Sequence, residues 1–156
     1  MKVMPLETAQ RAQLYVMGQF LLIGLFAVAV LVRPAAANPL WHGIGFAICV
    51  PGIAIIVWAL VTMGRVMQVS PEPRADGHLV TRGIYAWLRH PMYTGIVLIV
   101  VGLLVRSPSL IPAIVGAALV VLLVAKSRFE EGLLLARYPD YAAYRARTWG
   151  VFPGIR

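Results

Sequence analysis

Four long apolar blocks, separated by polar connections, dominate the pattern of side chains along the chain. The first two are long enough to cross a bilayer, because a hydrocarbon core of about 30 Å needs roughly 20 apolar residues in a helix. The third and fourth are shorter and must borrow flanking residues or tilt in order to cross. The pattern predicts an all-α, polytopic membrane protein. Membrane-spanning helices are expected at about 14–32, 41–63, 91–106 and 110–126.

The composition agrees with this pattern. Of the 156 residues, 60% are hydrophobic, and the mean hydropathy is +0.81. Soluble domains use only roughly 45–50% apolar residues, so an ordinary soluble domain is excluded. A chain of this length suggests one domain, covering residues 1–156. The single cysteine, Cys49, lies in the second apolar block, so neither a disulfide framework nor a metal cluster is expected.

The positive charges alternate along the chain in a way that predicts its orientation. Twelve Lys and Arg residues lie before the first block, in the loop 64–90 or from Lys126 onward, whereas the two other connections hold two. Under the positive-inside rule this predicts cytoplasmic N- and C-termini, with a cytoplasmic loop 64–90 and tail 127–156. The net charge of +8 is therefore explained by topology and anionic lipid head groups, and no nucleic-acid partner is expected.

The cytoplasmic tail is predicted to form two helices that Pro139 separates. Tyr138, Tyr141, Tyr144 and Arg145 recur at helical spacing and form one aromatic and basic stripe. Two interpretations stay open for this stripe. It can lie on the membrane surface as an amphipathic segment, or it can cover a site on the cytoplasmic face.

The entrance to the third apolar block, "LRHPMYTG", is unusually polar. Proline is favoured in the first turn of a helix, which places the helix start at Pro91 and the cap at His90. A helix N-terminus attracts carboxylates and phosphates, because its backbone N–H groups are unpaired and carry partial positive charge. Arg89 and Tyr93 add donors, and Gly95 leaves room for a close approach. These features predict a receptor for an anionic group.

Two adjacent carboxylates, Glu130 and Glu131, directly follow the fourth block. One interpretation pairs them with Lys126 and Arg128 across a helical turn. The other places one glutamate against a cationic part of a ligand. An anion receptor beside two carboxylates suits a zwitterionic, positively charged molecule such as S-adenosylmethionine, although a lipid head group satisfies the same physical argument.

Three motifs in order, "HLVTRGIYAWLRHPMYTG", "RFEE" and "YPDYAAYRARTWGVFPGI", resemble the isoprenylcysteine carboxyl methyltransferase family of integral membrane enzymes, in its short prokaryotic form. The related phospholipid N-methyltransferases share the RHPxYxG and paired-glutamate patterns. The resemblance covers about residues 64–156. The chain departs from it at Tyr138-Pro139, where the family often has Phe-Gly, and at "VLLVAKS", where aromatic residues and an arginine are usual.

The resemblance implies an S-adenosylmethionine pocket under a cytoplasmic helical cap, with no metal. The implied catalytic residues are Glu130, Glu131 and Arg145. The implied cofactor-binding residues are Gln68, Leu79, Val80, Gly83, Tyr85, Arg89, His90, Pro91, Tyr93, Gly95 and Glu130.

The expected function is therefore methyl transfer from S-adenosylmethionine to a lipophilic acceptor within a prokaryotic inner membrane. The acceptor most like that of the family is the carboxylate of an isoprenylcysteine. Methylation of a phospholipid amine is the main alternative. A reductase that uses NADPH, and a small membrane scaffold or lipid-binding protein without enzymatic activity, are further alternatives.

Overall fold

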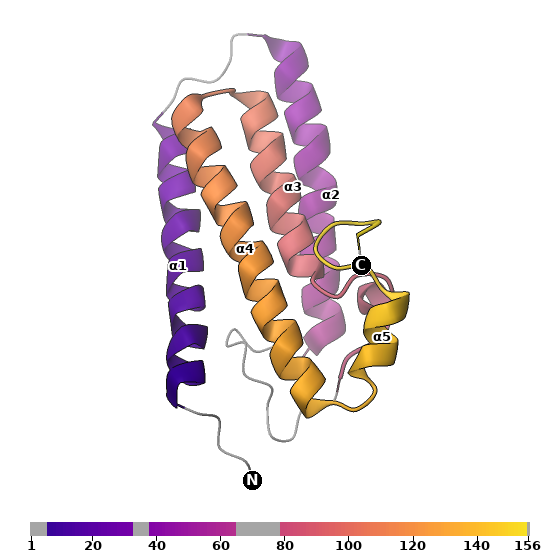
Figure 1. Cartoon of the computed structure of the whole chain (residues 1–156). Helices are drawn as coiled ribbons and strands as arrows, with labels where there is room; N and C mark the ends of the chain where they lie inside the picture. The colour runs from indigo at the N-terminus through magenta and orange to yellow at the C-terminus, as the bar shows by residue number, and fades with distance from the viewer. Residues whose placement is uncertain (1–5, 33–37, 65–78, 156) are drawn as a thin grey trace.

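The computed structural model describes residues 6–32, 38–64 and 79–155. These residues form a bundle of long helices with a short helix packed beside one end (Figure 1). The helices are α1 (Leu6–Leu31), α2 (Pro39–Met63), α3 (Pro91–Arg106), α4 (Leu110–Arg137) and α5 (Tyr141–Arg147), with a 3₁₀ turn η2 (Gly83–Ala86) before α3. Within the described ranges no strand forms, and the predicted all-α class is confirmed.

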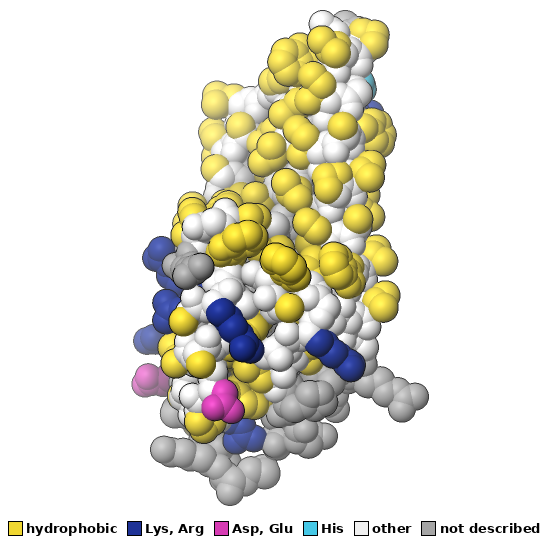
Figure 2. Space-filling model, turned by 90° about the vertical axis from the view of Figure 1, so that its right-hand side faces the viewer, with side chains coloured by type: hydrophobic (Ala, Val, Ile, Leu, Met, Phe, Trp, Pro, Cys, Tyr) yellow, Lys and Arg dark blue, Asp and Glu magenta, His cyan; other side chains and the backbone are white. Residues whose placement is uncertain are grey.

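Three of the helices are long and apolar enough to cross a membrane, namely α1, α2 and α4. Helix α3 is shorter, with 16 residues, so a fourth crossing stays a prediction. Figure 2 shows hydrophobic side chains over the upper part of the bundle, while most of the visible charged side chains gather in its lower part. This distribution and the three long apolar helices confirm a polytopic membrane protein.

Two helix bounds differ from those that hydropathy alone predicts. Helix α1 begins at Leu6 rather than near residue 14, and α4 continues past its apolar block to Arg137. Hydropathy marks the apolar part of a helix, whereas polar residues with good helix propensity extend it on both sides. The predicted start at Pro91 with His90 as the cap is confirmed, and so is the break between α4 and α5 near Pro139.

Helices α2 and α3 are packed closely through pairs of glycines. A Cβ atom on Gly95 would lie 2.6 Å from the carbonyl oxygen of Gly52, and one on Gly102 would lie 2.7 Å from that of Gly45. Small residues let two backbones approach within a membrane, where van der Waals contact drives helix association. Gly95, predicted to leave room for a ligand, therefore makes room for α2.

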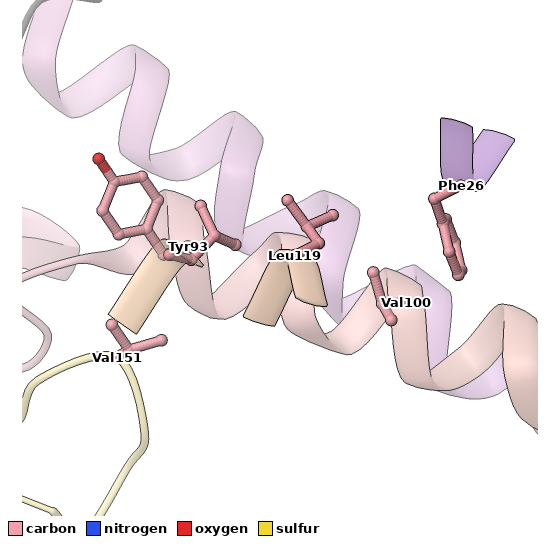
Figure 3. Packing of buried hydrophobic residues seen from close by; sticks show 6 residues of the cluster. Phe26, Tyr93, Val100, Leu119 and Val151 are labelled. Carbon is pink, nitrogen blue, oxygen red and sulfur yellow. The ribbon is translucent and has the colours of Figure 1, made fainter. Parts of the chain in front are cut away.

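Helix α1 packs on α4 along a seam whose buried positions in α1 are Ala12, Gln19 and Phe26. The apolar core of the bundle runs from Phe26 past Leu119 to Tyr93, as Figure 3 shows. Two of the three α1 positions are apolar, as expected for a helix packed in a bundle. Gln19 is the polar exception in this seam.

The tail is packed against the chain around the start of α3. The Arg89 backbone nitrogen donates to the Trp149 carbonyl oxygen (2.8 Å). The Trp149 backbone nitrogen donates in turn to the Trp87 carbonyl oxygen (2.9 Å). The Tyr144 hydroxyl donates to the Tyr85 carbonyl at 2.6 Å. Figure 1 shows the resulting place of α5 beside the lower end of the bundle. Of the two interpretations of the aromatic stripe, the structure favours packing against the protein.

Candidate active site

Arg89 lies buried between the start of α3, helix α4 and the tail. Its Nε donates to Glu131 Oε1 at 2.8 Å. Its Nη1 donates to the carbonyl oxygens of Arg145 (3.0 Å) and Thr148. A buried guanidinium needs such partners, because leaving it unpaired would cost several kcal/mol. The contacts of Arg89 thus hold the tail and Glu131 in place, and its predicted role in cofactor binding is not tested by them.

His90 lies between the two glutamates. Its Nε2 is 3.2 Å from Glu131 Oε1, and its Nδ1 is 3.6 Å from Glu130 Oε2. Its ring also stacks on that of Tyr93, with centroids 5.4 Å apart and planes 3° from parallel. Whichever ring nitrogen carries a hydrogen, a carboxylate oxygen is its neighbour. His90 therefore sets the spacing of the two carboxylates.

Glu130 accepts a hydrogen bond from the Tyr93 hydroxyl at 2.7 Å through its Oε1. The same oxygen lies 3.8 Å from Lys126 Nζ, so the pairing of these residues across one helical turn is confirmed. Arg128, the other predicted partner, is exposed. Glu130 thus faces groups from both α3 and α4 while its side chain keeps partial exposure.

Glu131 meets a third element through Arg145 of α5. Arg145 Nε lies 3.1 Å from Glu131 Oε2, and the Arg145 side chain is 49% exposed. Glu131 is therefore shared by the buried Arg89 and the half-exposed Arg145. All three residues predicted to be catalytic, Glu130, Glu131 and Arg145, come together here, and their catalytic roles stay predictions.

Three tyrosines of η2 and α5 are neutral hydrogen-bond donors at physiological pH. Burial, with a smaller contribution from the negative charge of Glu130, raises the pKa of Tyr85 to about 12. Burial also raises the pKa of Tyr144 to about 12 and raises that of Tyr141. Among the described residues, the Tyr141 hydroxyl is the buried side-chain group without a hydrogen-bond partner. Such a group is a candidate donor to a ligand.

The other predicted cofactor-binding residues lie around η2 and the start of α3. Gly83 has φ +58°, and a Cβ atom there would lie 2.8 Å from Thr62 Oγ1 of α2. Val80 packs against the cluster that includes Tyr85, whose hydroxyl is 3.9 Å from Met63 Sδ. These contacts dock η2 onto the end of α2.

Three further predicted residues complete the set. Leu79 is half-buried, and Pro91 is buried in the first turn of α3. Gln68 lies outside the described residues. Their predicted roles in cofactor binding are not tested by these positions.

Two polar residues next to this site were missing from the predicted set. Lys126 Nζ donates to Gln19 Oε1 at 2.7 Å, across the seam between α4 and α1. The signal in the sequence was weak. Gln19 is a lone polar residue in the first apolar block, and Lys126 directly follows the fourth.

A family model described as phospholipid methyltransferase matches residues 40–141 of the chain. The match covers more than half of the chain, including the start of α3 and both glutamates. The chain therefore belongs to the phospholipid methyltransferase family, and the resemblance to integral membrane methyltransferases is confirmed.

Two curated relatives and one solved structure define the likeness further. The cobalt-zinc-cadmium resistance protein CzcN of Cupriavidus metallidurans is 30% identical over 117 residues, which cover 74% of this chain and 54% of CzcN. The protein-S-isoprenylcysteine O-methyltransferase of Tribolium castaneum is 34% identical over 108 residues, which cover 63% of this chain and 37% of that enzyme. The chain thus spans about half or less of the length of these relatives.

The solved structure is that of the eukaryotic intramembrane Ras methyltransferase, an isoprenylcysteine carboxyl methyltransferase. It matches with a TM-score of 0.61 at 24% identity, over 92% of this chain and 53% of that one. At this level of identity, the match shows that the two proteins share a fold.

Proposed function

We propose that the protein is an S-adenosylmethionine-dependent methyltransferase acting on a lipophilic acceptor in the membrane. The observation that carries the proposal is the meeting of both glutamates with His90 at the start of α3, in a chain of this family. A scaffold without enzymatic activity would leave the polar residues of this segment in solvent. Arg89 and His90 are instead buried and bonded to the carboxylates.

The residues present fit the methyl donor by their charges and donors. Glu130 offers a carboxylate for an ammonium group, and the half-exposed Arg145 offers a cation for a carboxylate. The unpaired hydroxyl of Tyr141 offers a further hydrogen bond. When bound, S-adenosylmethionine supplies a methyl group on a sulfonium centre, which leaves as a thioether. Mixed charges of this kind match a zwitterionic molecule better than a simple anion.

The protein's own task would be mainly to position groups. Arg89 and His90 hold Glu131, and Glu131 in turn orients Arg145. A carboxylate acceptor needs no general base, so catalysis would come from alignment and from the removal of water around the acceptor.

Calorimetry on the purified protein tests donor binding. We expect saturable binding of S-adenosylmethionine, weakened about tenfold or more by Glu130→Gln, because one charge-assisted contact is worth about 1.5–3 kcal/mol. Arg145→Gln should lower methyl transfer, whereas Arg147→Gln, which changes an exposed arginine on the same helix, should not. An absence of saturable binding by the parent protein would overturn the proposal.

The second candidate function, methylation of a phospholipid amine, is favoured by the description of the matching family. A labelled donor distinguishes the two when it is incubated with a farnesylated cysteine or with phosphatidylethanolamine. Alkali releases the label from a methyl ester as methanol, but an N-methyl group stays attached. The labelled product that forms identifies the acceptor class.

We also propose the inner membrane of a prokaryote as the location, with both termini in the cytoplasm. The uneven distribution of Lys and Arg supports this orientation. A cysteine introduced at Ser109, between α3 and α4, should react with an impermeant reagent added outside spheroplasts. Labelling of this position only after lysis would contradict the orientation.

A further inference from the structure

The seam between α1 and α4 contains a polar pair that the proposed reaction does not use. Lys126 is 2% exposed, and Gln19 is 9% exposed. Lys126 Nζ donates to Gln19 Oε1 at 2.7 Å. Gln19 occupies the middle of the three buried positions of α1, between Ala12 and Phe26. A buried lysine is thus held by α1, a helix that contains none of the residues predicted for the site.

The same ammonium group also reaches the proposed site. It lies 3.8 Å from Glu130 Oε1 and 5.4 Å from the centre of the Tyr93 ring. Tyr93 donates to that same oxygen of Glu130. One carboxylate oxygen therefore faces an ammonium from α4 and a hydroxyl from α3, and Gln19 of α1 fixes the position of the ammonium.

Stability alone does not explain this arrangement. Taking an ammonium out of water costs several kcal/mol, and replacing a buried ion pair by apolar side chains of similar volume is often neutral or stabilising. The place of Lys126 beside Glu130 indicates a function that concerns this carboxylate.

We propose that Lys126 is a positioning residue: held by Gln19, it keeps the Glu130 carboxylate ionised and turned toward Tyr93. Helix α1 thereby becomes part of the methyl-transfer site. The consequence for donor binding rests on the proposed function, whereas the effect on Glu130 does not. Within the described part of the chain, the titratable or charged groups that face Glu130 are Lys126, Tyr93, Tyr85, His90 and the neighbouring Glu131. His90 also contacts Glu131, whereas Glu130 is the carboxylate that pairs with Lys126 among the described residues.

Infrared spectroscopy of Lys126→Met tests the effect on Glu130. The methionine side chain keeps the volume, but the change removes one partner of a buried polar pair and leaves Gln19 Oε1 without its donor. The variant should therefore unfold at a lower temperature than the parent, and the spectra are compared below that temperature. At pH 7 we expect a stronger band of protonated carboxyl, because the loss of a cation about 4 Å away favours the neutral acid by about tenfold or more. The band should disappear when Glu130→Gln is added, which assigns it to Glu130.

Calorimetry on the same variants tests the consequence for the site. Lys126→Met should weaken binding of S-adenosylmethionine about tenfold, and Lys126→Arg should restore most of it, since the charge returns. Gln19→Leu alone should weaken donor binding less than Lys126→Met does. Added to Lys126→Met, it should weaken binding no further, because Gln19 acts through the lysine. Gln19→Leu leaves all charges in place, so it also tests the proposal if Lys126→Met does not fold.

Tyr15→Leu is the matched control, since the Tyr15 and Phe129 rings pack 5.3 Å apart in the same seam. It should change neither the infrared band nor donor binding. The proposal is overturned if Lys126→Met shows no added protonation of Glu130, if Gln19→Leu and Lys126→Met act additively, or if Tyr15→Leu has the same effects. If the parent binds no donor, the proposed function fails, and the infrared result still decides the role of Lys126.

Discussion

An arginine and a histidine meet at each end of α3, but the surroundings of the two pairs differ. At its start, Arg89 and His90 are buried and contact the paired glutamates of α4. At its end, Arg106 Nε donates to His42 Nδ1 at 3.1 Å, and the guanidinium lies 5.2 Å from the centre of the Phe46 ring. Both Arg106 and His42 are half-buried.

The difference shows that an arginine and a histidine do not make a site by themselves. A buried guanidinium requires a compensating carboxylate, whereas a half-exposed one is satisfied by an imidazole nitrogen and an aromatic face. The carboxylates therefore distinguish the two ends. Variants at each end can test how much of the molecule's stability and ligand binding depends on them.

The largest effect is expected for Glu131→Gln. The change removes the negative charge that Arg89 and Arg145 share, so the buried Arg89 loses its compensation. Breaking a buried ion pair from one side costs about 3–5 kcal/mol, and donor binding should be lost as well. Unfolding in detergent micelles and calorimetry measure the two losses. Glu7→Gln, at an exposed carboxylate of α1, is the control, and equal stability of both variants would contradict the prediction.

A smaller effect is expected from alanine at the paired glycines of α2 and α3. The added Cβ of Gly95→Ala would meet Gly52 O, and that of Gly102→Ala would meet Gly45 O, so each should destabilise the fold by about 1–3 kcal/mol. Gly95 lies close to the candidate site, so we expect only Gly95→Ala to weaken donor binding. Gly24→Ala is the control, because an added Cβ there would meet no atom of another helix within 4 Å, so it should not destabilise the protein. If Gly95→Ala and Gly102→Ala weakened donor binding equally, the two ends of α3 would not be independent.

The contact between Tyr144 and the Tyr85 carbonyl should contribute about 1 kcal/mol, which Tyr144→Phe removes. This contact also has a pH dependence. Burial raises the pKa of Tyr144 to about 12, whereas the unfolded chain loses this proton near pH 10. The stabilisation is thus complete below about pH 10 and is lost as the pH rises through about 12.

The free energy of unfolding, measured between about pH 9 and pH 12, tests whether stability falls as the pH rises. The parent should lose more stability than Tyr144→Phe, while Tyr15→Phe on α1 should follow the parent. Parallel curves for the parent and Tyr144→Phe would contradict the prediction.

The smallest effect is expected at the other end of α3. Arg106→Gln removes one hydrogen bond and one cation–π contact at a half-exposed position, worth about 0.5–1 kcal/mol. Donor binding should be unchanged. If it fell as far as in Glu131→Gln, the contrast between the two ends would be wrong.

Local sequence was sufficient to locate several features of the protein. Long apolar blocks identify membrane helices because hydrocarbon excludes polar side chains, and Pro91 and Pro139 mark helix bounds because proline restricts its own backbone and that of the preceding residue. Family motifs selected the glutamates and the start of α3. All of these signals act within a few residues of chain.

The partners of these residues depend on how the helices pack. Arg89 contacts Glu131, 42 residues away, and Lys126 reaches Gln19, 107 residues away. Gly95 faces α2 rather than open space, and the motif that contains it does not distinguish these two arrangements. Hydropathy and helix caps are properties of neighbouring residues, whereas the pairing of buried charges is set by which helix faces meet in the folded bundle.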